Sequence, residues 1–100
     1  MKIPKSVTIL GRRFTVQKVG EKWFQSKELG NACGALNFSS RSIMIKDTLS
    51  KEDSLITFLH ECHHAMDFIC GFSQVVSGDR FEIEAESRAN GFYDVFKAIK

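Results

Sequence analysis

The sequence has no apolar run of membrane-spanning length, and its first residues lack the apolar core of a secretory signal. Internal repeats, low-complexity segments and linker-like segments are absent as well. These absences predict a single domain, residues 1–100, that does not bind a membrane. The hydrophobic fraction of 43% is ordinary for a globular chain, so disorder is not expected.

Cysteine is scarce, with only Cys33, Cys62 and Cys70 in the chain. This odd number, without the spacing of a zinc ribbon, is best explained by free thiols in a reducing compartment. We therefore expect a cytoplasmic protein. Cys62 lies inside the histidine-rich segment described below, but it is rotated off the ligand face. We interpret it as a small buried hydrophobe rather than a metal ligand.

Excess charge of one sign is also missing, because the formal net charge is only +2. The distribution is less even: residues 1–30 carry seven basic and two acidic side chains. A basic surface of this kind can contact nucleic acid or an acidic protein. No nucleic-acid-binding motif accompanies it, so we interpret it as a solvated face and consider nucleic-acid binding the weakest function.

Histidine is confined to one short segment, and His60, Glu61 and His64 within it form the pattern His-Glu-x-x-His. On a helix, residues four apart project from one face, so His60 and His64 can bind one zinc ion. Glu61 lies beside the first ligand, where its carboxylate can take a proton from a zinc-bound water. Apolar flanking residues indicate a buried helix, in which accidental histidines would lack partners.

The surrounding sequence predicts a helix that carries this pattern at its centre. Ser50 is a typical N-cap and Gly71 a typical C-cap, which gives a helix of about twenty residues. A second helix is expected to begin at Asp79, with Glu82 as a capping-box partner. Its apolar stripe consists of Ala85, Ala89, Phe92, Phe96 and Ile99.

Alternating apolar residues predict two β-hairpins before the helices, one within residues 6–19 and one within residues 33–46. The fold class expected is therefore α+β, with a small antiparallel sheet followed by two helices. Trp23 and Phe24 are expected to fill the core from a loop or a short helix. Ser42–Lys46 is our candidate for an edge strand that pairs with an extended substrate, and pairing on both sides is the alternative.

A catalytic zinc site needs a third protein ligand, and no histidine remains to supply it. Glu82 and Glu86 both border the apolar stripe of the second helix. We favour Glu86, because Asn90 lies one turn later and can hold the carboxylate by a hydrogen bond, whereas Glu82 can serve as a cap. Alternatively, the acidic residues in the first half of this helix bind no metal and only form a solvated helix start. Asp67 either orients a metal-binding histidine or lies at the surface.

Two segments, ITFLHECHHAMD (residues 56–67) and ESRANGFY (residues 86–93), resemble ImmA/IrrE-type zinc metallopeptidase-like proteins. More narrowly, they resemble the short stand-alone members common in phages and prophages. Residues 5–16 also resemble the start of those proteins, so the similarity covers most of the chain. Several members carry a helix-turn-helix or regulatory domain that this sequence lacks.

The resemblance implies a gluzincin-like, zincin-type minimal core with zinc on His60, His64 and Glu86, and with Glu61 as general base. It implies a hydrolase that acts on a protein or peptide substrate. The leading expectation is therefore a zinc metallopeptidase. The alternative is an inactive, zinc-stabilised binding module for a regulatory protein. The presence of Glu61 favours the enzyme, because a structural zinc site needs no base, whereas the shortness of the chain favours the module.

Overall fold

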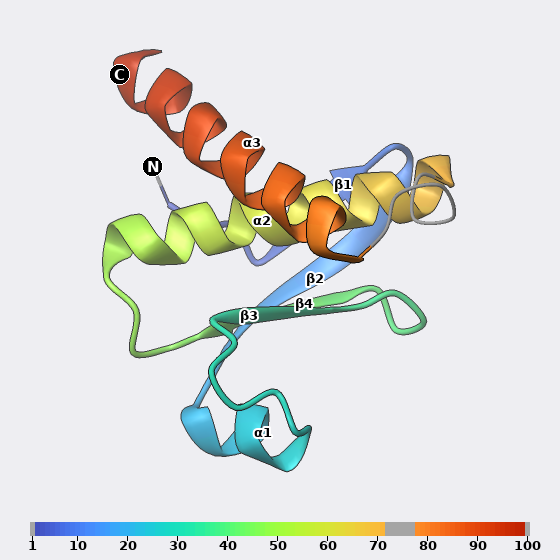
Figure 1. The fold of residues 1–100 in the computed structure, drawn as a ribbon, viewed down its shortest axis with the longest axis vertical. Coiled ribbons are helices and arrows are strands. Elements are labelled where there is room, and N and C mark those ends of the chain that lie inside the picture. The colour runs from blue at the N-terminus through green and yellow to red at the C-terminus, as the bar shows by residue number, and fades with distance from the viewer. Residues whose placement is uncertain (1, 72–77, 100) are drawn as a thin grey trace.

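The computed structural model describes the backbone of residues 2–71 and 78–99 (Figure 1). Within these ranges the elements are β1 (Ser6–Ile9), β2 (Arg12–Val19), α1 (Glu21–Ser26), β3 (Gly34–Asn37), β4 (Ser42–Lys46), α2 (Lys51–Cys70) and α3 (Gly78–Ile99). The α+β class is the one that the sequence predicts. No helix in the described ranges is both long enough and apolar enough to cross a bilayer.

The strands form one sheet in the order β1-β2-β4-β3. The predicted hairpins are both present, because β1 pairs antiparallel with β2 and β3 pairs antiparallel with β4. The prediction of a purely antiparallel sheet was wrong, since β2 and β4 are parallel neighbours. The reason is topological: the chain crosses through α1 to the outermost strand β3, and β4 then inserts between β3 and β2.

This order also corrects the expected edge strand. Ser42–Lys46 is β4, which pairs with β2 on one side and with β3 on the other. The alternative, a strand paired on both sides, is therefore the right one. The edge strands are β1 and β3, and β3 (Gly34–Asn37) makes the more extensive contact with α2.

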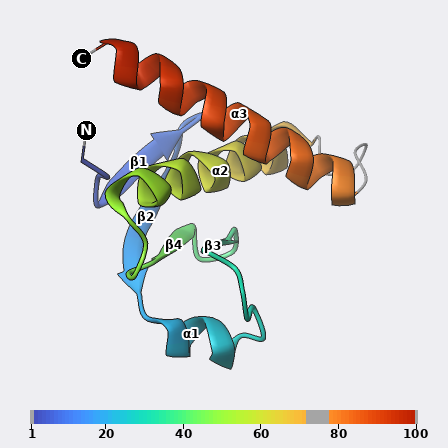
Figure 2. The same ribbon diagram turned by 60° about the vertical axis from the view of Figure 1, so that its left-hand side comes forward.

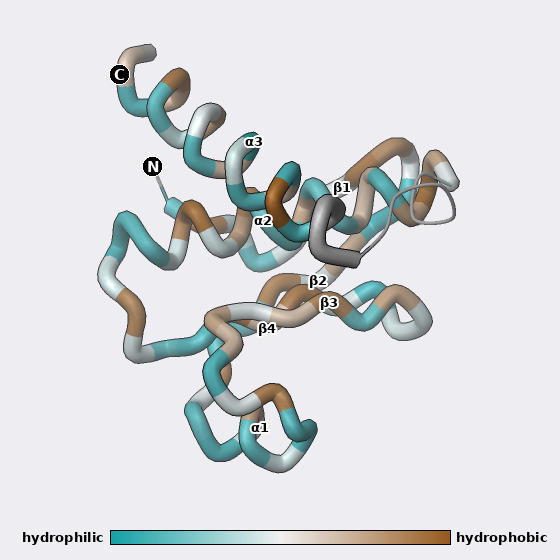
Figure 3. The backbone as a smooth tube through the Cα atoms, in the orientation of Figure 1, coloured by the Kyte–Doolittle hydropathy of each residue, from teal (hydrophilic) through white to brown (hydrophobic). Residues whose placement is uncertain are grey.

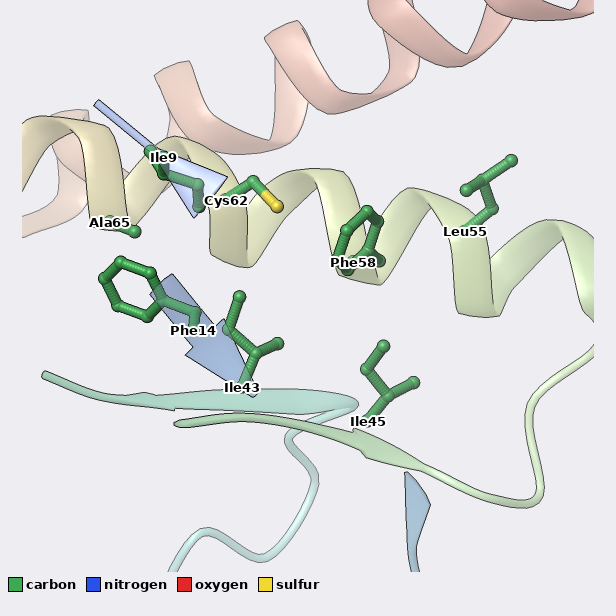
Figure 4. Close-up of a cluster of buried hydrophobic side chains, with 8 residues drawn as sticks. All are labelled: Ile9, Phe14, Ile43, Ile45, Leu55, Phe58, Cys62 and Ala65. Carbon is green, nitrogen blue, oxygen red and sulfur yellow. The ribbon is translucent and has the colours of Figure 1, made fainter. Parts of the chain in front are cut away.

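The core lies between the sheet and α2. Its buried apolar residues are Ile9, Phe14, Ile43 and Ile45 from the strands, and Leu55, Phe58, Cys62 and Ala65 from α2 (Figure 4). Ile43 and Ile45 alternate with Met44 along β4, so they share the face toward α2 and are fully buried. Burying each isoleucine stabilises the fold by roughly 1.5–3 kcal/mol. Cys62 packs as the buried hydrophobe that we expected.

The caps of α2 follow their sequence signals, whereas the predicted apolar stripe of α3 is buried at Ala85 and Ala89 but exposed at Phe92. The Ser50 side chain accepts a hydrogen bond from the Asp53 N–H at 3.0 Å, and Gly71 ends α2 in the left-handed conformation with φ of 79°. Apolar and polar residues alternate in bands along α2 and α3, so each helix has an apolar side (Figure 3). The backbone of α3 is helical from Gly78, but the predicted capping contact of Asp79 lies outside the described side chains.

The opposite face of the sheet carries α1, the short helix predicted around Trp23 and Phe24 (Figure 2). Phe24 is fully buried, as expected for a residue that fills the core. The Trp23 ring packs edge-on against it, with ring centroids 5.1 Å apart. The sheet therefore separates α1 from the two helices that carry the candidate site.

The three thiols should differ in reactivity. Burial, reinforced by the charge of Glu61, raises the pKa of Cys62 to about 12, whereas Cys33 and Cys70 are exposed free thiols. Because the thiolate is the nucleophile, iodoacetamide at pH 8 should modify Cys33 and Cys70 in the folded protein and Cys62 only after unfolding. Peptide mapping by mass spectrometry checks this. Rapid modification of Cys62 in the folded protein would contradict the packing described here.

Candidate metal centre

The site lies in a cleft where α2, α3 and β3 meet. Helix α2 places His60, Glu61 and His64 along one wall, because His60 and His64 lie about one turn apart on the same face and Glu61 is next to His60. The first turns of α3 contribute Glu82 and Glu86, and the edge strand forms the remaining wall. The cleft has a volume of about 500 Å³. It brings together the histidines and acidic residues that the sequence singled out as candidate ligands.

Three side chains converge closely enough to hold a metal ion: His60, His64 and Glu82. The two imidazole Nε2 atoms lie 3.0 Å apart. The Glu82 carboxylate places Oε1 at 3.0 Å from His64 Nε2 and Oε2 at 3.1 Å from His60 Nε2. Tetrahedral zinc with bonds of about 2.0–2.1 Å separates its ligand atoms by roughly 3.3 Å, so the donor set fits such an ion.

Hydrogen-bond chemistry supports a cation at this point. His60 Nδ1 lies 2.7 Å from Glu86 Oε2, and a carboxylate accepts only, so Nδ1 donates to Glu86. In the neutral ring the Nε2 lone pair then faces the Glu82 carboxylate, and a cation between these two acceptors satisfies both. Burial lowers the pKa of His64, although the Glu82 carboxylate opposes this effect, so His64 tends to be neutral. One proton on His64 satisfies only one contact of the group, whereas a metal ion satisfies all three.

Glu86 occupies a different place from the one we expected. Its carboxylate contacts Nδ1 of His60, and Glu82 holds the position facing both Nε2 atoms. The two glutamates lie one turn apart on the same face of α3, and the crossing of the helices brings the earlier one to the metal-binding atoms. Asn90 does contact Glu86, donating from Nδ2 to Oε1 at 3.2 Å. In this arrangement Glu86 and Asn90 orient His60.

Asp67 does not lie at the surface, so that alternative considered for it was wrong. It is buried, and its Oδ2 lies 3.1 Å from Nδ1 of His63. Across the helix interface, Nη1 of Arg88 donates to Nε2 of His63 at 2.9 Å. These contacts, from Arg88 through His63 to Asp67, tie α3 to α2 beside the site. The four-residue spacing of His63 and Asp67 predicts their pairing, but nothing local to the sequence signals Arg88.

Glu61 is almost completely buried, with 7% of its surface exposed. Burial raises its pKa to about 7, an effect that nearby His60 reduces and that Glu82 and Glu86 reinforce. A carboxylate with this pKa is matched to proton transfer near neutral pH. The predicted base therefore lines the same cleft as the metal-binding group.

Gly34 is a site residue that the sequence reasoning missed. A Cβ at this position would lie 2.5 Å from Thr57 Cγ2, 3.1 Å from the Met44 carbonyl oxygen and 3.3 Å from Glu61 Oε2. Glycine therefore allows β3 to approach α2 closely beside the buried carboxylate. An isolated glycine within a strand pattern is the signal that indicates such an approach.

Comparisons with protein-family models, with curated proteins and with solved structures found no match to this chain. The site is therefore interpreted from its own geometry and chemistry.

The contributions of the two glutamates can be separated by matched variants. Glu82→Gln should weaken zinc binding by more than about 100-fold, because it removes the charged metal ligand that faces both Nε2 atoms. Glu86→Gln should cost roughly 10–100-fold, since it acts through the orientation of His60. Competition with a chromophoric chelator measures both affinities, and Asp94→Asn, farther along α3, is the control. A larger loss for Glu86→Gln would instead identify Glu86 as the ligand.

Proposed function

We propose that this protein is a zinc-dependent metallopeptidase that hydrolyses peptide bonds of a protein or peptide substrate. His60, His64 and Glu82 hold the ion in this proposal, and Glu61 is the general base. The observation that carries it is the convergence of two imidazole nitrogens and one carboxylate next to a second, buried carboxyl group, that of Glu61. This combination provides both a metal site and a proton acceptor.

The donor set favours zinc in a catalytic rather than a closed structural site. Two imidazoles and a carboxylate form a borderline-soft set of three protein ligands, which is typical of catalytic zinc and leaves a coordination position open. The group faces a cleft rather than the core, and 61% of the Glu82 side chain is exposed. A substrate can therefore reach the open position.

A bound zinc ion would supply Lewis acidity, which polarises a carbonyl and makes water more acidic. The role of Glu61 follows from its place beside His60 and its raised pKa. It accepts a proton from the attacking water and returns it to the amine as the peptide bond breaks. Glu86 and Asn90 keep the His60 ring in the tautomer that presents Nε2.

The edge strand β3 provides a place for the substrate backbone. Cys33 O accepts a hydrogen bond from Lys46 N, so alternation along the antiparallel pair directs the backbone groups of Gly34 and Leu36 outward. An extended peptide can add to this edge as a further strand. Because Gly34 lies against Glu61, such a peptide would pass the base and the metal group.

The ImmA/IrrE resemblance leads to the same class of protein, a metallopeptidase with ligands on two successive helices. Its phage and prophage members suggest a regulatory protein as substrate and a cytoplasmic site of action. These remain parts of the proposal.

A zinc-stabilised binding module is the second candidate, and one observation favours it. The candidate ligands come from both helices, so an ion would fasten α3 to α2 in addition to the contact between Arg88 and His63. In a small domain, such a link can provide much of the stability. A buried carboxylate in the same cleft as the candidate ligands has no role in such a module, which is why we prefer the enzyme.

Two variants distinguish the candidates. Glu61→Gln keeps the size of the side chain but removes the base, so zinc content and Tm should persist while hydrolysis of unstructured peptides falls by about 100-fold or more. His64→Ala should lose zinc, stability and hydrolysis together. Metal analysis, thermal unfolding and peptide cleavage are measured on both variants, with Glu52→Gln on α2 as the control.

Equal cleavage by Glu61→Gln and the parent would refute the proposed base. Absence of cleavage by the zinc-loaded parent, together with zinc-dependent binding of a regulatory protein, would establish the binding module instead.

A further inference from the structure

A second groove lies across the edge strand from the metal cleft. It has a volume of about 320 Å³, and we call it the Trp23 groove. Trp23 and Lys27 line it from α1 and the residue after that helix, and Met44 lines it from β4. Leu29, Ala35 and Leu36 border both this groove and the metal cleft. Only the edge strand and the loop before it therefore separate the two depressions.

Strand geometry connects the grooves to one ligand. Gly34 faces Thr57 and Glu61 on the α2 side, so its neighbour Ala35 faces the α1 side of the sheet. A peptide added to this edge in an extended conformation alternates in the same way. When one of its side chains enters the metal cleft, the next side chain points to the Trp23 groove.

The two grooves differ in charge. The metal cleft is lined by three acidic residues, Glu61, Glu82 and Glu86, and by no lysine or arginine. Lys27 is the one charged residue among those that line the Trp23 groove. Within the described part of the chain, no ion pair with Lys27 is formed. An acidic side chain is therefore disfavoured on one face of the strand and favoured on the other.

The walls of the Trp23 groove suit the stem of such a side chain. The Trp23 ring is held edge-on against the buried Phe24, and Met44 forms the floor with 6% of its surface exposed. Lys46, the nearest other cation along β4, places Nζ over the Phe24 ring at 5.3 Å from the centroid. Lys27 is therefore the cation in this groove that can pair with a carboxylate at the end of an aliphatic stem.

We propose that the Trp23 groove is a specificity subsite that binds a glutamate or aspartate of an extended peptide, directly next to the residue that enters the metal cleft. This inference rests on the proposed function, because it assumes that the substrate lies along β3. The subsite determines the register of the peptide and thereby which bond lies beside Glu61.

Charge reversal at Lys27 tests the subsite. Short fluorescent peptides rich in valine and threonine, each with one central Glu, Gln or Lys, are the probes. For the zinc-loaded protein we expect the Glu peptide to bind about threefold more tightly than the Gln peptide, as one partly exposed ion pair allows. Lys27→Glu should reverse this order and favour the Lys peptide. Lys22→Glu, on α1 but outside the groove, changes the net charge equally and should keep the parental preference.

Binding by fluorescence anisotropy and cleavage by mass spectrometry are recorded separately. Cleavage sites at a fixed position relative to the Glu, shifted or lost in Lys27→Glu, support the subsite. A charge preference in binding without any cleavage also supports it, but counts against the peptidase. Cleavage that ignores the charge of the peptide overturns the subsite and leaves the peptidase standing. The subsite is equally overturned if Lys22→Glu alters the preference as much as Lys27→Glu, or if no probe binds.

Discussion

The close crossing of α3 over α2 is the constraint on which the candidate site depends. Ala85 and Ala89 lie four residues apart on α3 and are fully buried, so small side chains let the helices approach. Arg88 adds a fixed point by its hydrogen bond to His63, which Asp67 holds from the other side. This registration brings the glutamates of α3 to the histidines of α2. Without this packing, His60 and His64 would lack the carboxylate that completes the metal-binding group.

The electrostatics of the cleft follow from the same packing. Glu61 is buried between α2 and the edge strand because Gly34 leaves room for it, and burial raises its pKa. The lone pairs of the histidines face one another at a distance that requires a proton or a metal ion between them. A cation is therefore the natural partner of this cluster, and its charge would also favour the ionised form of the neighbouring base.

Local patterns predicted much of this molecule. The hairpins, the caps at Ser50 and Gly71, and the motif on the face of a long helix all follow from spacing and turn chemistry. The order of the strands did not, because the insertion of β4 beside β2 depends on contacts between distant segments. The sequence could not settle the choice between Glu82 and Glu86 for a related reason: both share one face of α3, and only the helix crossing brings Glu82 to both Nε2 atoms and Glu86 to Nδ1 of His60.

X-ray absorption at the zinc edge tests the central claim, that these side chains form a metal centre, most directly. For protein purified without added zinc, we expect about one zinc per chain, with two imidazole nitrogens and carboxylate or water oxygens at roughly 2.0–2.1 Å. His60→Ala with His64→Ala should abolish the signal. A zinc–sulfur distance near about 2.3 Å, or undiminished zinc in the double variant, would contradict the account, because it would place the ion on cysteine or elsewhere in the chain.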